Sequence, residues 1–148
     1  MKKIAYLCLF TLFFASCEKD DFCIEPITPN LIIRFYDGVN TTETKAVSEL
    51  YVWPEGRDSI LINATTDSIA IPLDVNNSST IYNLSMGTTQ DQITINYTTE
   101  EVFVSRSCGF KAIFNDVSVS ANNIWITNTS VISTNIENES SAHIQIFH

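Results

Sequence analysis

The sequence predicts an all-β domain folded as an antiparallel β-sandwich, and three observations support this. Short apolar runs recur at close spacing and are separated by turn residues. Residues 92–98 alternate apolar with polar side chains, which is typical of a strand with one buried face. Helix signals are nearly missing after Cys23. We expect an immunoglobulin-like or related Greek-key arrangement, with a small barrel as the alternative.

The first four expected strands are bounded by turn and breaker residues. Residues 31–36 end at Asp37-Gly38, a turn dipeptide. Residues 48–53 end at Pro54, which cannot donate a ladder hydrogen bond. The next two runs each begin with Ser-Ile directly after an aspartate, so we expect them to pair as a hairpin. These runs are 59–62 and 68–73, and residues 63–67 would close the turn.

The second half of the chain continues with similar runs. We expect strands at 80–84, 92–98, 102–107, 110–114, 117–120, 124–127, 131–136 and 143–147. Glu100 and Glu101 lie between two of these runs, where we expect a solvated turn. Gly109 suggests a bulge or bend. No low-complexity segment interrupts these runs, so residues 31–148 form one predicted domain.

The N-terminal residues are ordered like an export signal. A basic start precedes an apolar run over residues 4–14, which is too short to span a bilayer. Small residues then precede Cys17, and this order resembles the bacterial lipoprotein box. The resemblance implies that residues 1–16 are a cleaved signal peptide and that Cys17 carries acyl chains. Residues 17–30 would then be the lipidated N-terminus and tether. The alternatives are an ordinary secretory signal cleaved after Ser16 and a buried apolar strand.

The charged residues after Cys17 bear on localisation. Lys19, Asp20 and Asp21 resemble the export signal of Bacteroidota-type surface lipoproteins. That resemblance implies an outer-membrane protein exposed on the cell surface. The alternatives are the periplasmic face of the same membrane, or a charged run that is simply a solvated tether.

Two cysteines remain once Cys8 leaves with the signal and Cys17 carries lipid. These are Cys23 and Cys108. In an oxidising compartment two cysteines most simply pair. Such a bridge would close a loop of about 85 residues and stabilise the fold by about 4 kcal/mol in the chain-entropy model. Two separate thiols are the alternative.

The composition disfavours several classes of chemistry. A net charge of −9 with no basic patch disfavours a nucleic-acid partner. The chain contains four glycines and no Gly-x-Ser-x-Gly elbow. Its two histidines, His143 and His148, do not share one strand face. We therefore expect no enzyme activity, no cofactor and no metal, although carboxylates from distant strands could still make a hydrolase.

Aromatic residues are the better indication of binding. Tyr51 and Trp53 are two residues apart and share one strand face, and Trp125 is near a second strand. Exposed aromatics favour protein interfaces or sugar stacking, whereas core packing is the alternative. Ser59 and Ser68 follow aspartate and precede an apolar residue, which resembles the O-glycosylation signal of Bacteroidota-type envelopes.

Residues 17–21, 31–36 and 103–110 resemble a family of small, uncharacterised Bacteroidota-type envelope lipoproteins. The family has no assigned activity, so the resemblance implies localisation and adds no catalytic residue. The sequence therefore predicts a lipid-anchored, non-enzymatic binding module. Its expected partners are the membrane and either an envelope protein or a glycan. The alternatives are an accessory subunit of an outer-membrane assembly and the hydrolase with dispersed carboxylates.

Overall fold

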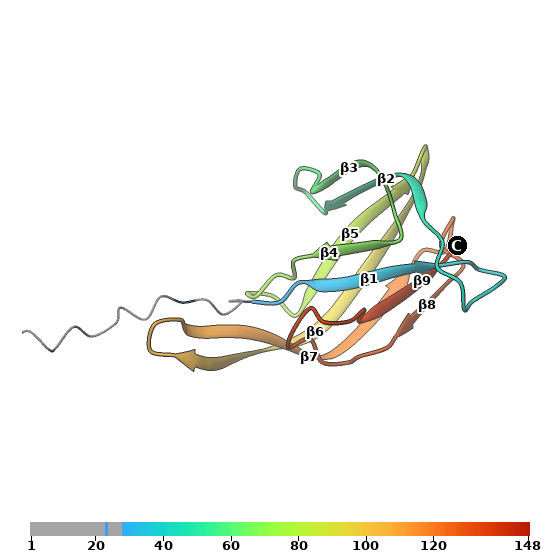
Figure 1. Cartoon of the computed structure of the whole chain (residues 1–148). Helices are drawn as coiled ribbons and strands as arrows, with labels where there is room; N and C mark the ends of the chain where they lie inside the picture. Colours follow the sequence, from blue (N-terminus) through green and yellow to red (C-terminus); the bar gives the residue numbers. More distant parts are fainter. Residues whose placement is uncertain (1–22, 24–27) are drawn as a thin grey trace, which may run out of the picture.

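The computed structural model describes Cys23 and residues 28–148, and these residues fold into two packed β-sheets (Figure 1). One sheet has the strand order β4-β1-β9-β8 and the other β3-β2-β5-β6-β7. The strands are β1 Leu31–Tyr36, β2 Val47–Pro54, β3 Leu61–Thr66, β4 Ser68–Ile71, β5 Ser79–Met86, β6 Thr89–Ser105, β7 Gly109–Ala121, β8 Asn128–Val131 and β9 Ile144–Phe147. Within these residues, no helix is long and apolar enough to cross a membrane.

The strand pairing is antiparallel except at one place. Strands β2, β3, β5, β6 and β7 pair antiparallel throughout their sheet. In the other sheet β1 pairs antiparallel with β4 and parallel with β9. Two open sheets facing each other make a sandwich rather than a barrel, so the predicted fold class is confirmed. Hydrophobic alternation does not encode strand direction, and for this reason the parallel pair was not predicted.

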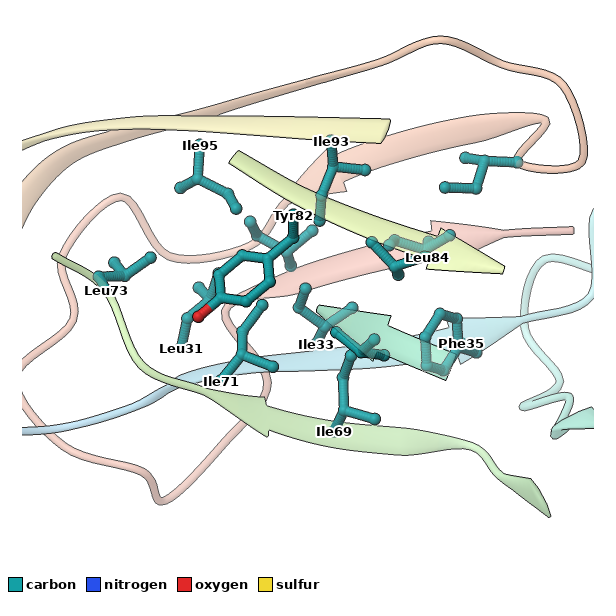
Figure 2. Packing of buried hydrophobic residues seen from close by; sticks show 14 of the residues in the cluster. Leu31, Ile33, Phe35, Ile69, Ile71, Leu73, Tyr82, Leu84, Ile93 and Ile95 are labelled. Carbon is teal, nitrogen blue, oxygen red and sulfur yellow. The ribbon is translucent and has the colours of Figure 1, made fainter. Parts of the chain in front are cut away.

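The core lies between the two sheets (Figure 2). Most of its side chains come from alternate positions of β1, β4, β5, β6 and β9, and the rest come from β2, β7 and the loops. Leu31, Ile33 and Phe35 of β1 face it, as does Tyr82 of β5. Burying each such side chain stabilises the fold by roughly 1.5–3 kcal/mol. Tyr82 Oη donates a 2.6 Å hydrogen bond to Pro72 O, which satisfies the buried hydroxyl. Burial raises the pKa of Tyr82 to about 12, so the phenol stays neutral.

Strands β6 and β7 are longer than predicted and form a hairpin that extends past the other strands (Figure 1). The expected turn at Glu100 and Glu101 is wrong, because both residues pair within the ladder, with Ile113 and Ala112. Solvent reaches both glutamates there, so a strand can hold them without burying charge. The irregularity in this stretch is a shift in the β6–β7 register after Asn96, and the chain makes no turn there.

The predicted hairpin between 59–62 and 68–73 is also wrong. Strand β3 pairs with β2 in one sheet, and β4 pairs with β1 in the other. The chain continues as a strand through the expected turn, with Asn63 at φ 49° beside an irregular β2–β3 register. It then crosses between the sheets at Asp67. The repeated Asp-Ser-Ile sequence therefore marks two sheet edges rather than two paired strands.

Residues 124–127 form a loop where a strand was expected. The carboxylate of Asp91, which is 1% exposed, binds this loop. It accepts backbone N–H hydrogen bonds from Ile124, Trp125 and Ile126 at 2.7–3.0 Å. These backbone groups find their acceptor in a side chain instead of a neighbouring strand, which replaces the ladder that the apolar pattern predicted.

Candidate functional site on the outer face of the five-stranded sheet

Tyr51 and Trp53 lie on the outer face of strand β2. Leu50 and Val52, which alternate with them, are fully buried in the core. Because successive side chains of a strand point to opposite faces, the two aromatic side chains point away from the core. Both are partly exposed. The prediction that they share one face is confirmed by their register partners on β5, where Tyr51 pairs with Ser85 and Trp53 with Asn83.

A cluster of side-chain amides lies beside these aromatic residues. Asn83 is 7% exposed, and its Oδ1 accepts hydrogen bonds from Gln90 Nε2 at 3.0 Å and from Gln92 Nε2 at 3.2 Å. We call Tyr51, Trp53 and these three amides the aromatic platform. Sequence reasoning missed the amides, because their proximity to Trp53 depends on the register between β2, β5 and β6. The only sequence signal for these amides was the polar face of the alternating residues 92–98, which includes Gln92.

Trp53 also borders a concavity formed with Gly56, Arg57 and Asp58. Arg57 and Asp58 continue into an adjoining groove of about 620 Å³ between the β2–β3 and β4–β5 loops. We call this the loop groove. Its other lining residues include Ile60, Asp74, Val75, Asn76 and Asn77. The platform and the loop groove therefore form one continuous surface.

The loop groove carries charges of both signs. Asp74 accepts a hydrogen bond from the backbone N–H of Asn76 at 2.9 Å and one from Asn77 Nδ2 at 2.8 Å. These two hydrogen bonds, in that order, lower the pKa of Asp74, and the nearby Arg57 charge lowers it further. Asp74 is thus a carboxylate at neutral pH, with Arg57 as the cation on the same surface.

The arrangement suits a polyhydroxylated ligand. Partly exposed aromatic rings present flat apolar faces, and the neighbouring amide, guanidinium and carboxylate groups supply donors and acceptors. Within the described part of the chain, no group of three or more His, Cys, Asp or Glu side chains is arranged to hold a metal ion.

Trp125 does not belong to this surface. It is 7% exposed, and its Nε1 donates a hydrogen bond to Leu84 O at 3.2 Å. Its ring centroid lies 6.4 Å from that of Phe35 and 5.7 Å from that of His148. The alternative of core packing therefore holds for Trp125, which removes it from the candidate binding aromatics.

The two serines considered for O-glycosylation differ in environment. Ser59 lies in the exposed β2–β3 loop. Ser68 begins β4, and its hydroxyl donates a hydrogen bond to Ile33 O at 3.3 Å. Ser59 is therefore the more accessible of the two acceptors.

The structure contains the predicted disulfide between Cys23 and Cys108, whose Cα atoms are 4.8 Å apart. Cys108 lies in the turn of the β6–β7 hairpin, where its backbone N–H donates to Ser105 Oγ at 3.1 Å. The bridge therefore attaches the N-terminal segment to the outer end of this hairpin. Cys17, Lys19, Asp20 and Asp21, which carry the lipidation and export expectations, lie outside the described residues.

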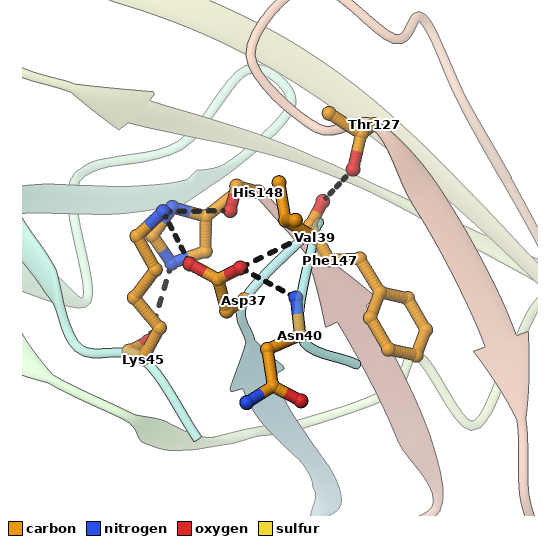
Figure 3. A network of polar contacts seen from close by, with 7 residues as sticks. All are labelled: Asp37, Val39, Asn40, Lys45, Thr127, Phe147 and His148. Carbon is orange, nitrogen blue, oxygen red and sulfur yellow. Dashed lines mark hydrogen bonds and ion pairs between the residues drawn. The ribbon is translucent and has the colours of Figure 1, made fainter. Parts of the chain in front are cut away.

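A second polar cluster joins the β1–β2 loop to the end of β9 (Figure 3). Asp37 Oδ1 accepts the backbone N–H groups of Val39 and Asn40 at 2.8 Å, and its Oδ2 pairs with Lys45 Nζ at 3.1 Å. The backbone hydrogen bonds from Asn40 and Val39, followed by the contact with Lys45, lower the pKa of Asp37 to about 2. Lys45 Nζ also donates to His148 O. These mutual contacts give the cluster a role in fixing the loop.

His143 is buried and uses both ring nitrogens. Its Nδ1 accepts the backbone N–H of Ile32 at 3.0 Å, so the ring proton is on Nε2, which lies 3.0 Å from Asn138 O. Burial lowers the pKa of His143, while the Asn138 contact opposes this effect. The histidine therefore connects two segments as a neutral ring.

We expect the fold to lose stability as the pH falls from 7.5 to 5.5. An unfolded histidine takes up a proton near pH 6.5, whereas folded His143 resists it, so acid favours the unfolded chain. One such group contributes at most about 1.4 kcal/mol per pH unit below pH 6.5. His148, whose pKa burial also lowers, acts in the same direction.

The measurement is urea unfolding at several pH values for the wild type and His143→Gln. The variant should be less stable at pH 7.5 and show a shallower loss between pH 6.5 and 5.5. An identical slope for the two proteins would contradict the assignment to His143.

The family comparison covers most of the described chain. No curated protein and no solved structure gives a significant match to the chain. A family model matches residues 49–148, a span that runs from within β2 to the end of the chain and includes Tyr51, Trp53 and the β6–β7 hairpin. The chain therefore belongs to DUF6452, a family of unknown function.

Proposed function

We propose that the mature protein is a lipid-anchored, non-enzymatic module on the outer face of a bacterial outer membrane, and that it binds a glycan. The observation that carries the glycan assignment is the pair Tyr51 and Trp53 on one outer sheet face beside the amides of Asn83, Gln90 and Gln92. The anchor is supported by the order of residues 1–17, which resembles a lipoprotein signal.

A glycan matches the chemistry of this surface in two ways. The C–H face of a sugar ring stacks on an aromatic side chain, and its hydroxyls hydrogen-bond to amides and carboxylates. The loop groove next to Trp53 supplies Arg57, Asp58 and Asp74 as further polar partners. The net charge of −9 disfavours a strongly acidic ligand.

The disulfide supports an extracytoplasmic location. Disulfides persist in oxidising compartments and are rare in the reducing cytosol. A bridge between Cys23 and Cys108 is therefore what an exported chain would form.

Replacing Cys17 with alanine tests the anchor. We expect the Cys17→Ala variant to leave the membrane fraction and to carry no acyl mass, because two or more acyl chains on one residue are needed for stable anchoring. Protease added to intact cells should digest the wild type. Membrane retention of a variant from which residues 1–16 have been cleaved would contradict the anchor. Protection of the wild type until the outer membrane is broken would place it on the periplasmic face.

Replacing Trp53 with alanine tests the platform. Binding of the purified protein is measured on an array of bacterial and host-surface polysaccharide fragments. We expect Trp53→Ala to weaken the strongest binding by about tenfold, the equivalent of about 1.4 kcal/mol. Phe110→Ala, which removes an exposed aromatic side chain elsewhere, should bind like the wild type. Equal binding by wild type and Trp53→Ala would exclude the platform as the glycan site.

A further inference from the structure

We infer that the outer end of the β6–β7 hairpin contacts the lipid surface through an exposed pair of phenylalanines. Phe103 and Phe110 are direct partners in the β6–β7 register. They are 58% and 61% exposed, and their ring centroids are 5.5 Å apart in an edge-to-face arrangement. Two large apolar side chains that contact each other and remain this exposed form an apolar surface patch, and such a patch indicates an interaction site.

The patch continues the core-lining face of its sheet. Phe114, which pairs with Thr99, is fully buried and packs edge-to-face on Tyr97. Four residues closer to the turn, Phe110 lies on the same face because strand side chains repeat with a period of two. The hairpin extends beyond the sandwich there (Figure 1). Phe103 and Phe110 thus lie on the part of this apolar face that extends beyond the opposite sheet, so that sheet does not cover them.

The disulfide brings this patch close to the proposed anchor. Cys108 lies in the hairpin turn and is bonded to Cys23. Cys23 follows Cys17 by six residues, so the two are at most about 21 Å apart whatever path the chain takes. If Cys17 is acylated, Cys23 is held within that distance of the membrane surface. The hairpin turn then lies within about 26 Å of it, because the Cα atoms of Cys23 and Cys108 are 4.8 Å apart. The inference rests on this anchor, which is part of the proposed function.

Charge at the hairpin end agrees with a lipid surface. Residues 102–111 include Arg106 and Lys111 and no acidic residue, in a chain with a net charge of −9. Lys111 Nζ donates a 3.1 Å hydrogen bond to Glu137 O, so Arg106 in the turn is the basic side chain placed to meet headgroups. Basic side chains can extend to phosphate headgroups while neighbouring phenylalanines enter the acyl boundary. Glu101 lies two residues before Phe103 on the same face. Its charge would limit how deeply the end of the hairpin enters the membrane.

This contact would orient the sandwich. Strand β7 runs from the hairpin turn to its other end at Ala121, so the loop with Ile124 lies at the opposite end of the sandwich, as does the C-terminus (Figure 1). Three attachments at one end, namely the acyl chains and two aromatic rings, would hold the domain with that opposite end away from the membrane. A lipid tether alone would leave the orientation free.

The test uses the lipidated mature chain in vesicles of phosphatidylethanolamine and phosphatidylglycerol. Photoreactive benzoylphenylalanine replaces Phe103 in one protein and Ile124, which is 66% exposed, in a control. After irradiation, mass spectrometry identifies the adducts. We expect position 103 to give about tenfold more phospholipid adduct than position 124. The double variant Phe103→Ser/Phe110→Ser should remain anchored. Protease should cleave it faster near Arg106 than it cleaves the wild type, because the hairpin end is no longer held on the membrane.

Two results would overturn the inference while leaving the anchor intact. One is equal lipid adduct at both positions, and the other is adduct from position 103 mainly to a second copy of this chain. The acyl mass of the same preparation is measured separately. Its absence would instead overturn the proposed anchor, so the two failures are distinguishable.

Discussion

Replacing Asp91 with alanine is expected to lower the free energy of unfolding by about 3–4 kcal/mol. Asp91 is 1% exposed, and its two carboxylate oxygens accept the backbone N–H groups of Ile124, Trp125 and Ile126. Alanine would leave these three donors without their acceptor, and an unsatisfied buried donor costs about 1–3 kcal/mol. The loss is a large part of the 5–15 kcal/mol that stabilises a typical domain.

The effect should extend beyond the loop itself. Trp125 packs against Phe35 of β1 and donates its Nε1–H to Leu84 O of β5. The 124–126 loop thus closes one end of the core between the two sheets, and Asp91 fixes the backbone that places the indole. We therefore expect the Asp91→Ala variant to unfold in one cooperative transition at lower urea, rather than to lose only the loop.

Two variants make this prediction specific. Asp91→Asn keeps one acceptor oxygen but loses the charge, so we expect a smaller loss of about 1–2 kcal/mol. Glu43→Ala removes an exposed carboxylate and should change stability by less than about 0.5 kcal/mol. Urea unfolding followed by tryptophan fluorescence measures all three. An Asp91→Ala loss no larger than that of Glu43→Ala would contradict the role given to this carboxylate.

Asp91 also illustrates which parts of the fold the sequence can predict. Strand β1 begins and ends as expected at residues 31–36, because its alternation is strong and a turn dipeptide follows it. Residues 124–127 have an equally apolar pattern and still form a loop. Their backbone partner is a side chain 33 to 35 residues earlier, and local periodicity carries no information about such a contact.

The same reasoning applies to strand pairing and to the site. The Asp-Ser-Ile repeat suggested a hairpin, but β3 and β4 belong to different sheets, since pairing is decided by which edges face each other in three dimensions. Tyr51 and Trp53 could be placed on one face from their spacing alone. The amide of Asn83 beside Trp53 depends on the β2–β5 register and could not be predicted.

Removing the disulfide is expected to cost about 4 kcal/mol of stability in the chain-entropy model. The bridge joins residues that are 85 positions apart, so it restricts the unfolded chain strongly. The double variant Cys23→Ser/Cys108→Ser tests this without leaving an unpaired thiol. Its unfolding midpoint in urea should fall well below that of the wild type, while Ser107→Ala in the same turn should unfold like the wild type.

The disulfide could stabilise the fold by restricting the unfolded chain or by holding the hairpin end locally. Which residues lose protection in the double variant distinguishes these two mechanisms. If the bridge acts on the unfolded chain, the β6–β7 hairpin should remain formed in the folded double variant, because its ladder from Ile93 to Phe103 does not involve the sulfur atoms. Protection of the β6 and β7 amides against hydrogen exchange should then fall only as far as global stability does. Rapid exchange confined to the residues around Phe103 and Phe110, with an unchanged urea midpoint, would show instead that the bridge acts locally by holding the hairpin end. In that case the disulfide would matter chiefly for presenting the two phenylalanines beside the anchor.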